Sequence, residues 1–192
     1  MVSLYISTLI NLLFVVIKII NGIRFGSAWF ISVGIYYALL AFTRFSLLVN
    51  LRREHSIASE YRIYRNTGVF MLVLNTALIA MIAQMILTDA RPEYPVNIIF
   101  INAAYSIFLI ALAVNNVVKY RRFKSPILSA VKAIGFLASL VSILMFQTTL
   151  LEYFGENTEF IRRMDTVTGA GVAAVIIIIA VDMIRKGTKN GY

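Results

Sequence analysis

The chain has 192 residues, of which 60% are hydrophobic and 14% are charged, and its mean hydropathy is +0.83. This composition excludes a soluble globular protein, because a soluble domain is typically about half apolar and about a quarter charged. The absence of cysteine excludes disulfide bonds, thiolate metal sites and cysteine nucleophiles. We therefore expect a single membrane domain over residues 1–192.

Six apolar stretches are long enough to form transmembrane helices, because a bilayer core of about 30 Å requires about 20 helical residues. In chain order they cover residues 2–21, 27–49, 66–87, 94–118, 126–150 and 166–184. The sequence therefore predicts an all-α integral membrane protein with six transmembrane helices. In size and layout it fits small substrate-binding permease subunits and other bacterial membrane proteins, at the level of architecture only.

The net charge of +9 comes mainly from cationic residues in the linkers between the apolar stretches. Such a distribution is typical of cytoplasmic membrane loops rather than of nucleic-acid binding. With both termini in the cytoplasm, eleven lysines and arginines lie on the inner side and five on the outer side. The inner residues are Arg52, Arg53, Arg62, Arg65, Lys119, Arg121, Arg122, Lys124, Arg185, Lys186 and Lys189, and the outer residues are Lys18, Arg24, Arg91, Arg162 and Arg163.

Two linkers are long enough to form structure of their own. Residues 51–65 either extend a neighbouring helix or form an amphipathic surface helix, with Ile57, Tyr61 and Tyr64 as its apolar stripe. Residues 151–165 combine aromatic and acidic side chains, so we expect them to lie flat at the outer interface. The candidates for binding anionic lipid headgroups on the inner face are Arg52, Arg53, Arg62 and Arg65.

The second, fourth and sixth stretches end alike, which indicates a possible internal repeat. Each carries one polar residue, Arg44, Asn115 or Asp182, shortly before a basic segment. If the similarity is a true repeat, the protein consists of three parallel helical hairpins. Similar composition alone can also produce this likeness between apolar helices.

Charged residues inside the apolar stretches are candidate functional groups, because burying a charge in a bilayer is costly. Arg44 lies about 12 Å along the helix from Arg52, and Lys132 lies a similar distance from Lys124. Each side chain either reaches back to the interface or lines an inward-facing cavity suited to an anionic ligand.

Asp182 also has two interpretations. It can pair with Arg185 and Lys186, which lie three and four residues further along the same helix. Alternatively it pairs with Lys132 of the preceding helix and forms a gate or a proton-linked switch.

Uncharged polar and small residues are explained mainly by helix packing. The polar residues are Asn75, Gln84, Asn102, Asn115, Asn116 and Gln147, and the small residues of the sixth stretch are Gly169, Gly171, Ala173 and Ala174. Asn115 and Asn116 are the best ligand-binding candidates among them, because consecutive residues point in different directions and cannot share one contact.

The hypothesis that we favour is a small-solute permease or substrate-capturing membrane subunit with a polar cavity on the cytoplasmic side. The residues that would line this cavity are Arg44, Asn115, Asn116, Lys132 and Asp182. This hypothesis predicts that Arg44, Lys132 and Asp182 face one interior cavity. We expect a bacterial-type cell membrane as the location, with anionic lipids of the inner face and a membrane subunit or second copy as partners.

Two other hypotheses remain open: a non-catalytic accessory or scaffold protein that binds a partner or anionic lipid, and an enzyme that acts on lipid phosphate. The sequence gives little support to an enzymatic function, since its single histidine, His55, lies in a basic linker. We therefore predict no catalytic residues, no metal site, no cofactor and no nucleic-acid partner.

Overall fold

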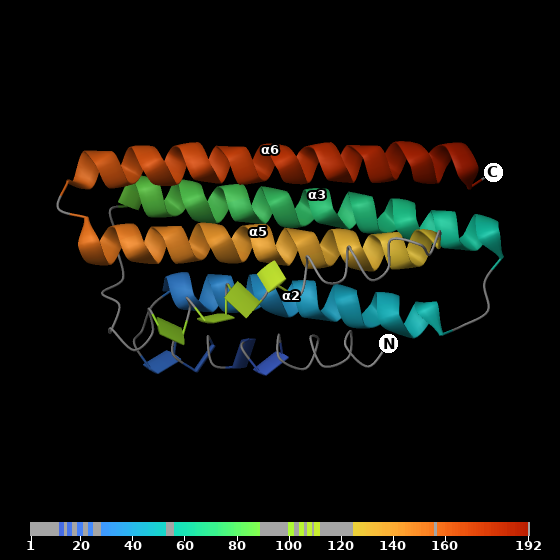
Figure 1. Cartoon of the computed structure of the whole chain (residues 1–192), viewed down its shortest axis with the longest axis horizontal. Coiled ribbons are helices and arrows are strands. Elements are labelled where there is room, and N and C mark those ends of the chain that lie inside the picture. Colours follow the sequence, from blue (N-terminus) through green and yellow to red (C-terminus); the bar gives the residue numbers. More distant parts are fainter. Residues whose placement is uncertain are drawn as a thin grey trace.

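Four long helices account for most of the computed structural model of the chain (Figure 1). They are α2 (Ala28–Leu51), α3 (Ile57–Thr88), α5 (Pro126–Phe154) and α6 (Thr158–Asn190). The structure describes residues 12–13, 15–16, 19–20, 23–24, 28–52, 56–88, 100–101, 104–105, 107–108, 110–111, 125–155 and 157–191. Each of the four helices is long and apolar enough to cross a membrane. The all-α prediction is therefore confirmed, and the helices are those of an integral membrane protein.

Four of the six predicted spans correspond to these helices. Residues 27–49, 66–87, 126–150 and 166–184 lie within α2, α3, α5 and α6, respectively, apart from the first residue of the earliest span. The predicted spans 2–21 and 94–118 fall mostly outside the described residues. Within the described part of the chain, four candidate spans are found rather than six.

Side-chain caps explain where three of the helices begin. The Ser56 hydroxyl accepts a hydrogen bond from the Ser59 amide at the start of α3. Ser125 caps α5 ahead of Pro126, whose missing N–H is not needed at the first helical position. Asn157 accepts hydrogen bonds from the amides of Glu159 and Phe160 at the start of α6.

Both long linkers differ from the sequence-based expectation. The chain leaves α2 at Leu51 and enters α3 at Ile57, so residues 57–65 are the first turns of α3. These turns pack against the last turns of α6, because Gly187 lies directly against Tyr61 and Arg65. The helix-extension alternative is confirmed, and the amphipathic surface helix is wrong.

The prediction that residues 151–165 lie flat at the interface is also wrong. The last turn of α5 reaches Phe154, and α6 begins at Thr158 after a short connection. Residues 158–165 are therefore helical and continuous with the sixth span. The physical reason is packing: Ile161 and Asp165 are buried, which fixes these two turns of α6 against the rest of the bundle.

The four helices form a bundle in which α3 and α5 run in one direction and α2 and α6 in the other (Figure 1). α2 and α6 lie on opposite sides, with α3 and α5 between them. The most extensive contact joins α3 to α6, while α2 packs mainly on α5. α5 and α6 form one antiparallel hairpin; the other two hairpins of the proposed repeat involve residues outside the described ranges.

One end of the bundle carries most of the described cationic residues. α2 and α6 end there, and α3 and α5 begin there (Figure 1). We call this the basic end, and its described lysines and arginines are Arg52, Arg62, Arg65, Arg185, Lys186 and Lys189. This matches the grouping of linkers that the charge count predicted for one side of the membrane.

Glycines allow α3 and α6 to approach closely. An ideal Cβ on Gly68 would lie 2.9 Å from the Ala180 carbonyl oxygen, and one on Gly169 would lie 3.0 Å from Ile82 Cδ1. Gly171, two residues further along α6, has nothing within 4 Å of the equivalent position. The small residues of the sixth span therefore serve two faces, one that packs on α3 and one that is exposed.

Candidate functional site

Arg44 lies on the face of α2 that is buried in the bundle. Residues of this face recur every three to four positions, as a helix side packed on its neighbours requires. They are Val33, Tyr36, Tyr37, Leu40, Ala41, Arg44, Leu47 and Leu48. Arg44 is only 2% exposed, so the interpretation that it reaches the interface is wrong.

The direction of α2 explains why Arg44 stays buried. Side chains tilt toward the N-terminus of their own helix. Because α2 ends at the basic end, the Arg44 side chain tilts away from that end and toward the middle of the bundle. Its Nη2 lies beside Gly135, 4.0 Å from the position that a Cβ would occupy there. Gly135 is about 14 Å of helix from the start of α5.

Lys132 has the opposite geometry. It lies one turn before Gly135 on α5, which begins at the basic end, so its side chain tilts toward that end. It is only partly buried, and it has an interaction partner of its own. The two cations that the sequence analysis treated alike therefore differ, because their helices run in opposite directions.

Three tyrosines form a cluster that includes one neighbour of the buried guanidinium. Tyr105 is buried and close enough to Arg44 to interact with it electrostatically. The Tyr37 ring meets Tyr105 edge-on, with 6.0 Å between ring centroids, and contacts Tyr36 at 6.2 Å. The Tyr37 hydroxyl is hydrogen-bonded to Ser142 of α5. The cluster thus connects Tyr36 and Tyr37 of α2, through Tyr105, to Arg44.

Several buried side-chain polar atoms of the described residues have no hydrogen-bond partner, and two of them belong to Arg44. Within the described part of the chain these atoms are Arg44 Nε, Arg44 Nη2, Tyr36 Oη and Asn75 Oδ1. A buried guanidinium with open N–H groups is costly, and these donors suit a carboxylate or phosphate oxygen. Chemically, the open N–H groups of Arg44 can donate charge-assisted hydrogen bonds.

Asp182 lies elsewhere. It accepts a hydrogen bond from Lys186 Nζ at 2.7 Å, one turn along α6, and both side chains are exposed. It also interacts electrostatically with Tyr64 of α3. Since α6 and α2 lie on opposite sides of the bundle, Asp182 does not join Arg44. The pairing within its own helix is observed, with Lys186 rather than Arg185.

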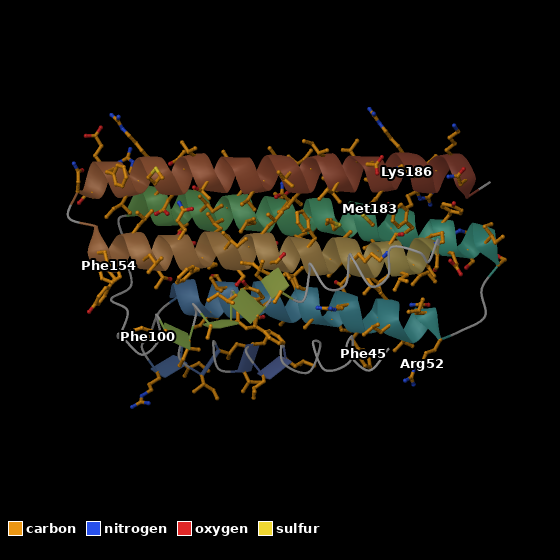
Figure 2. The ribbon with its side chains drawn as sticks, viewed as in Figure 1. Phe45, Arg52, Phe100, Phe154, Met183 and Lys186 are labelled. Atoms are coloured by element: carbon orange, nitrogen blue, oxygen red, sulfur yellow. The ribbon has the colours of Figure 1, made fainter. Side chains whose placement is uncertain are left out.

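The remaining predicted residues are distributed as follows. Asn115, Asn116 and Arg53 lie outside the described residues. Arg52 and Arg62 are exposed at the basic end, and Arg65 is partly buried against Gly187. Figure 2 shows Arg52 and Lys186 at this end and Phe154 at the opposite end. The structure therefore does not bring Arg44, Lys132 and Asp182 to one space.

A second polar cluster joins α5 to α6 near the end opposite the basic end. The Thr148 hydroxyl donates a hydrogen bond to Asp165 Oδ1 at 3.0 Å, and Gln147 Nε2 donates to Thr168 Oγ1 at 2.8 Å. Gln147 thus makes the interhelical contact that the sequence predicted. The sequence analysis placed Asp165 in the linker of residues 151–165 and therefore did not predict that it is buried.

Sequence reasoning also missed the tyrosines. Tyr36 and Tyr37 lie eight and seven residues before Arg44, a spacing of two helical turns that places them on the same face. That spacing could have indicated that the two tyrosines are buried on the same side of the helix as Arg44. The chain matches no protein-family model, no curated protein and no solved structure.

Proposed function

We propose that the protein is a small-solute permease or substrate-capturing membrane subunit that holds a small anion beside Arg44. We further propose six transmembrane helices, both termini in the cytoplasm, and a bacterial-type cell membrane. The basic end then faces the cytoplasm, in agreement with the positive-inside rule. Because Arg44, Lys132 and Asp182 do not share one cavity, the proposal rests on Arg44 alone, and Asp182 is not part of the site.

One observation carries the proposal: Arg44 is 2% exposed, and its Nε and Nη2 find no acceptor among the described residues. Leaving a buried charge unpaired costs on the order of 3–5 kcal/mol. Ionisable residues inside membrane spans are retained at such cost mainly where they serve function. A carboxylate or phosphate group is the ligand chemistry that would satisfy a guanidinium.

An accessory or scaffold role is the second candidate, and the exposed face of α6 favours it. Val167, Ala170, Gly171, Ala174 and Ile178 are exposed along this face. Small residues four positions apart, such as Ala170 and Ala174, let another membrane helix approach closely. This face would suit a partner subunit or a second copy of the chain.

Native mass spectrometry of the gently solubilised protein tests these proposals. We expect the wild-type protein to retain a small anion and Arg44→Gln to lose it, since glutamine supplies no positive charge. Arg162→Gln is the matched control, because Arg162 is exposed at the opposite end of the bundle. Identical spectra for wild type and Arg44→Gln would contradict the anion proposal, and a second chain without any anion would favour the accessory role.

A further inference from the structure

A groove of about 360 Å³ lies between α2 and α3 in the half of the bundle next to the basic end. Its α2 wall extends from Leu39 to Asn50, and its α3 wall extends from Ile63 to Phe70. Leu47 also belongs to the buried face of α2 that carries Arg44, but Arg44 itself does not line the groove, so the groove is separate from the anion site. A ligand bound in this groove would be additional to the anion of the proposed function.

The polar side chains of the groove are largely occupied within their own helices. Thr43 Oγ1 donates to the Leu39 carbonyl oxygen at 2.8 Å, and Thr67 Oγ1 donates to that of Ile63 at 2.9 Å. Asn50 Nδ2 donates to the Ser46 carbonyl oxygen at 2.9 Å. A hydrocarbon chain can therefore lie along the groove without leaving these hydrogen-bond donors unpaired.

The groove has the length of one leaflet. From Leu39 to Asn50 the helix rises about 16 Å, and half of a bilayer core is about 15 Å. Its walls carry apolar side chains such as Phe42, Leu47 and Phe70. Length and lining thus fit one acyl chain that runs from the middle of the membrane to the basic end.

Positive charge lies where the headgroup of such a lipid would be. Arg62 is exposed and lies one helical turn before Asn66, which lines the groove. Arg52 follows Asn50 by two residues, at the same end. Cations near a membrane surface attract anionic headgroups. Charge complementarity selects an anionic lipid over a zwitterionic one.

We infer that this groove binds one anionic phospholipid from the leaflet at the basic end, with an acyl chain between α2 and α3. The headgroup phosphate lies near Arg62 and Asn66. The site needs no displacement of the helices, because the groove is already open in the structure.

Lipid titration followed by native mass spectrometry tests the inference. The probes are phosphatidylglycerol and phosphatidylcholine with the same acyl chains, added to the full-length protein in mild detergent. We expect the first phosphatidylglycerol to bind more tightly than phosphatidylcholine. Arg62→Gln should weaken phosphatidylglycerol binding about fivefold, whereas Arg162→Gln at the opposite end should leave it unchanged. Ser46→Phe, which fills the groove, should weaken the binding of both lipids.

Three results would overturn the inference: equal affinity for the two lipids, equal losses in Arg62→Gln and Arg162→Gln, or a second copy of the chain bound in place of lipid. Should Ser46→Phe not fold, Arg62→Gln still decides, because Arg62 is exposed and its replacement leaves the packing intact. Arg44→Gln should retain the lipid, so failure of the anion site and failure of the lipid site can be distinguished.

Discussion

Replacement of Gly187 by alanine is expected to destabilise the bundle by about 1–3 kcal/mol, the usual cost of forcing extra atoms into a packed interface. An ideal Cβ at this position would lie 2.6 Å from Arg65 Cβ and 2.9 Å from the Tyr61 carbonyl oxygen. These atoms belong to or are fixed by the α3 backbone, so α3 and α6 must move apart. Thermal unfolding followed by the helical circular dichroism of the detergent-solubilised protein measures the effect.

Gly171→Ala is the matched control on the same helix. Nothing lies within 4 Å of its ideal Cβ, and alanine favours a helix over glycine by up to about 1 kcal/mol. Its melting temperature should therefore equal or exceed that of the wild type. If Gly171→Ala and Gly187→Ala melt at the same temperature, the close approach of α3 and α6 is refuted.

Replacement of Arg44 by methionine is expected to stabilise the ligand-free protein. Exchanging a buried ionic group for an apolar one of similar size often stabilises a protein by about 1–4 kcal/mol. Methionine would also remove the two hydrogen-bond donors of Arg44 that have no partner. The same change should abolish anion retention. Such opposite effects on stability and binding are the signature of a residue kept for function.

Arg62→Met provides the comparison, because Arg62 is exposed and surface substitutions usually change stability by less than about 0.5 kcal/mol. Equilibrium unfolding of both variants without added anions gives the required free energies. A marked loss of stability in Arg44→Met would instead assign Arg44 a structural role in joining α2 to α5.

Much of the fold follows from hydropathy alone. The apolar stretches located α2, α3, α5 and α6. The lysines and arginines of the linkers predicted which helix ends lie together at the basic end. Hydropathy failed at the helix ends, since it registers only the segment that crosses lipid. Residues 57–65 and 158–165 are helical because they pack on neighbouring helices and because Asn157 caps α6, and neither cause contributes to an apolar average.

The candidate site was predicted less well. Arg44 could be singled out because a charge within an apolar stretch is conspicuous, but its environment depends on which helix faces α2. The contact with Gly135 and the cluster of Tyr37 with Tyr105 join segments far apart in the chain, so no local pattern reports them. Asp182 illustrates the converse, since its observed partner Lys186 is one turn away and could be predicted.

The most direct test of the Arg44 site is thermal unfolding of wild type and Arg44→Met across a panel of small anions, including phosphate, acetate, citrate and glutamate at equal ionic strength. We predict that at least one anion raises the melting temperature of the wild type and that none raises that of Arg44→Met. Equal shifts in both proteins, or no shift in the wild type with any anion of the panel, would contradict the assignment of Arg44 as an anion-binding residue.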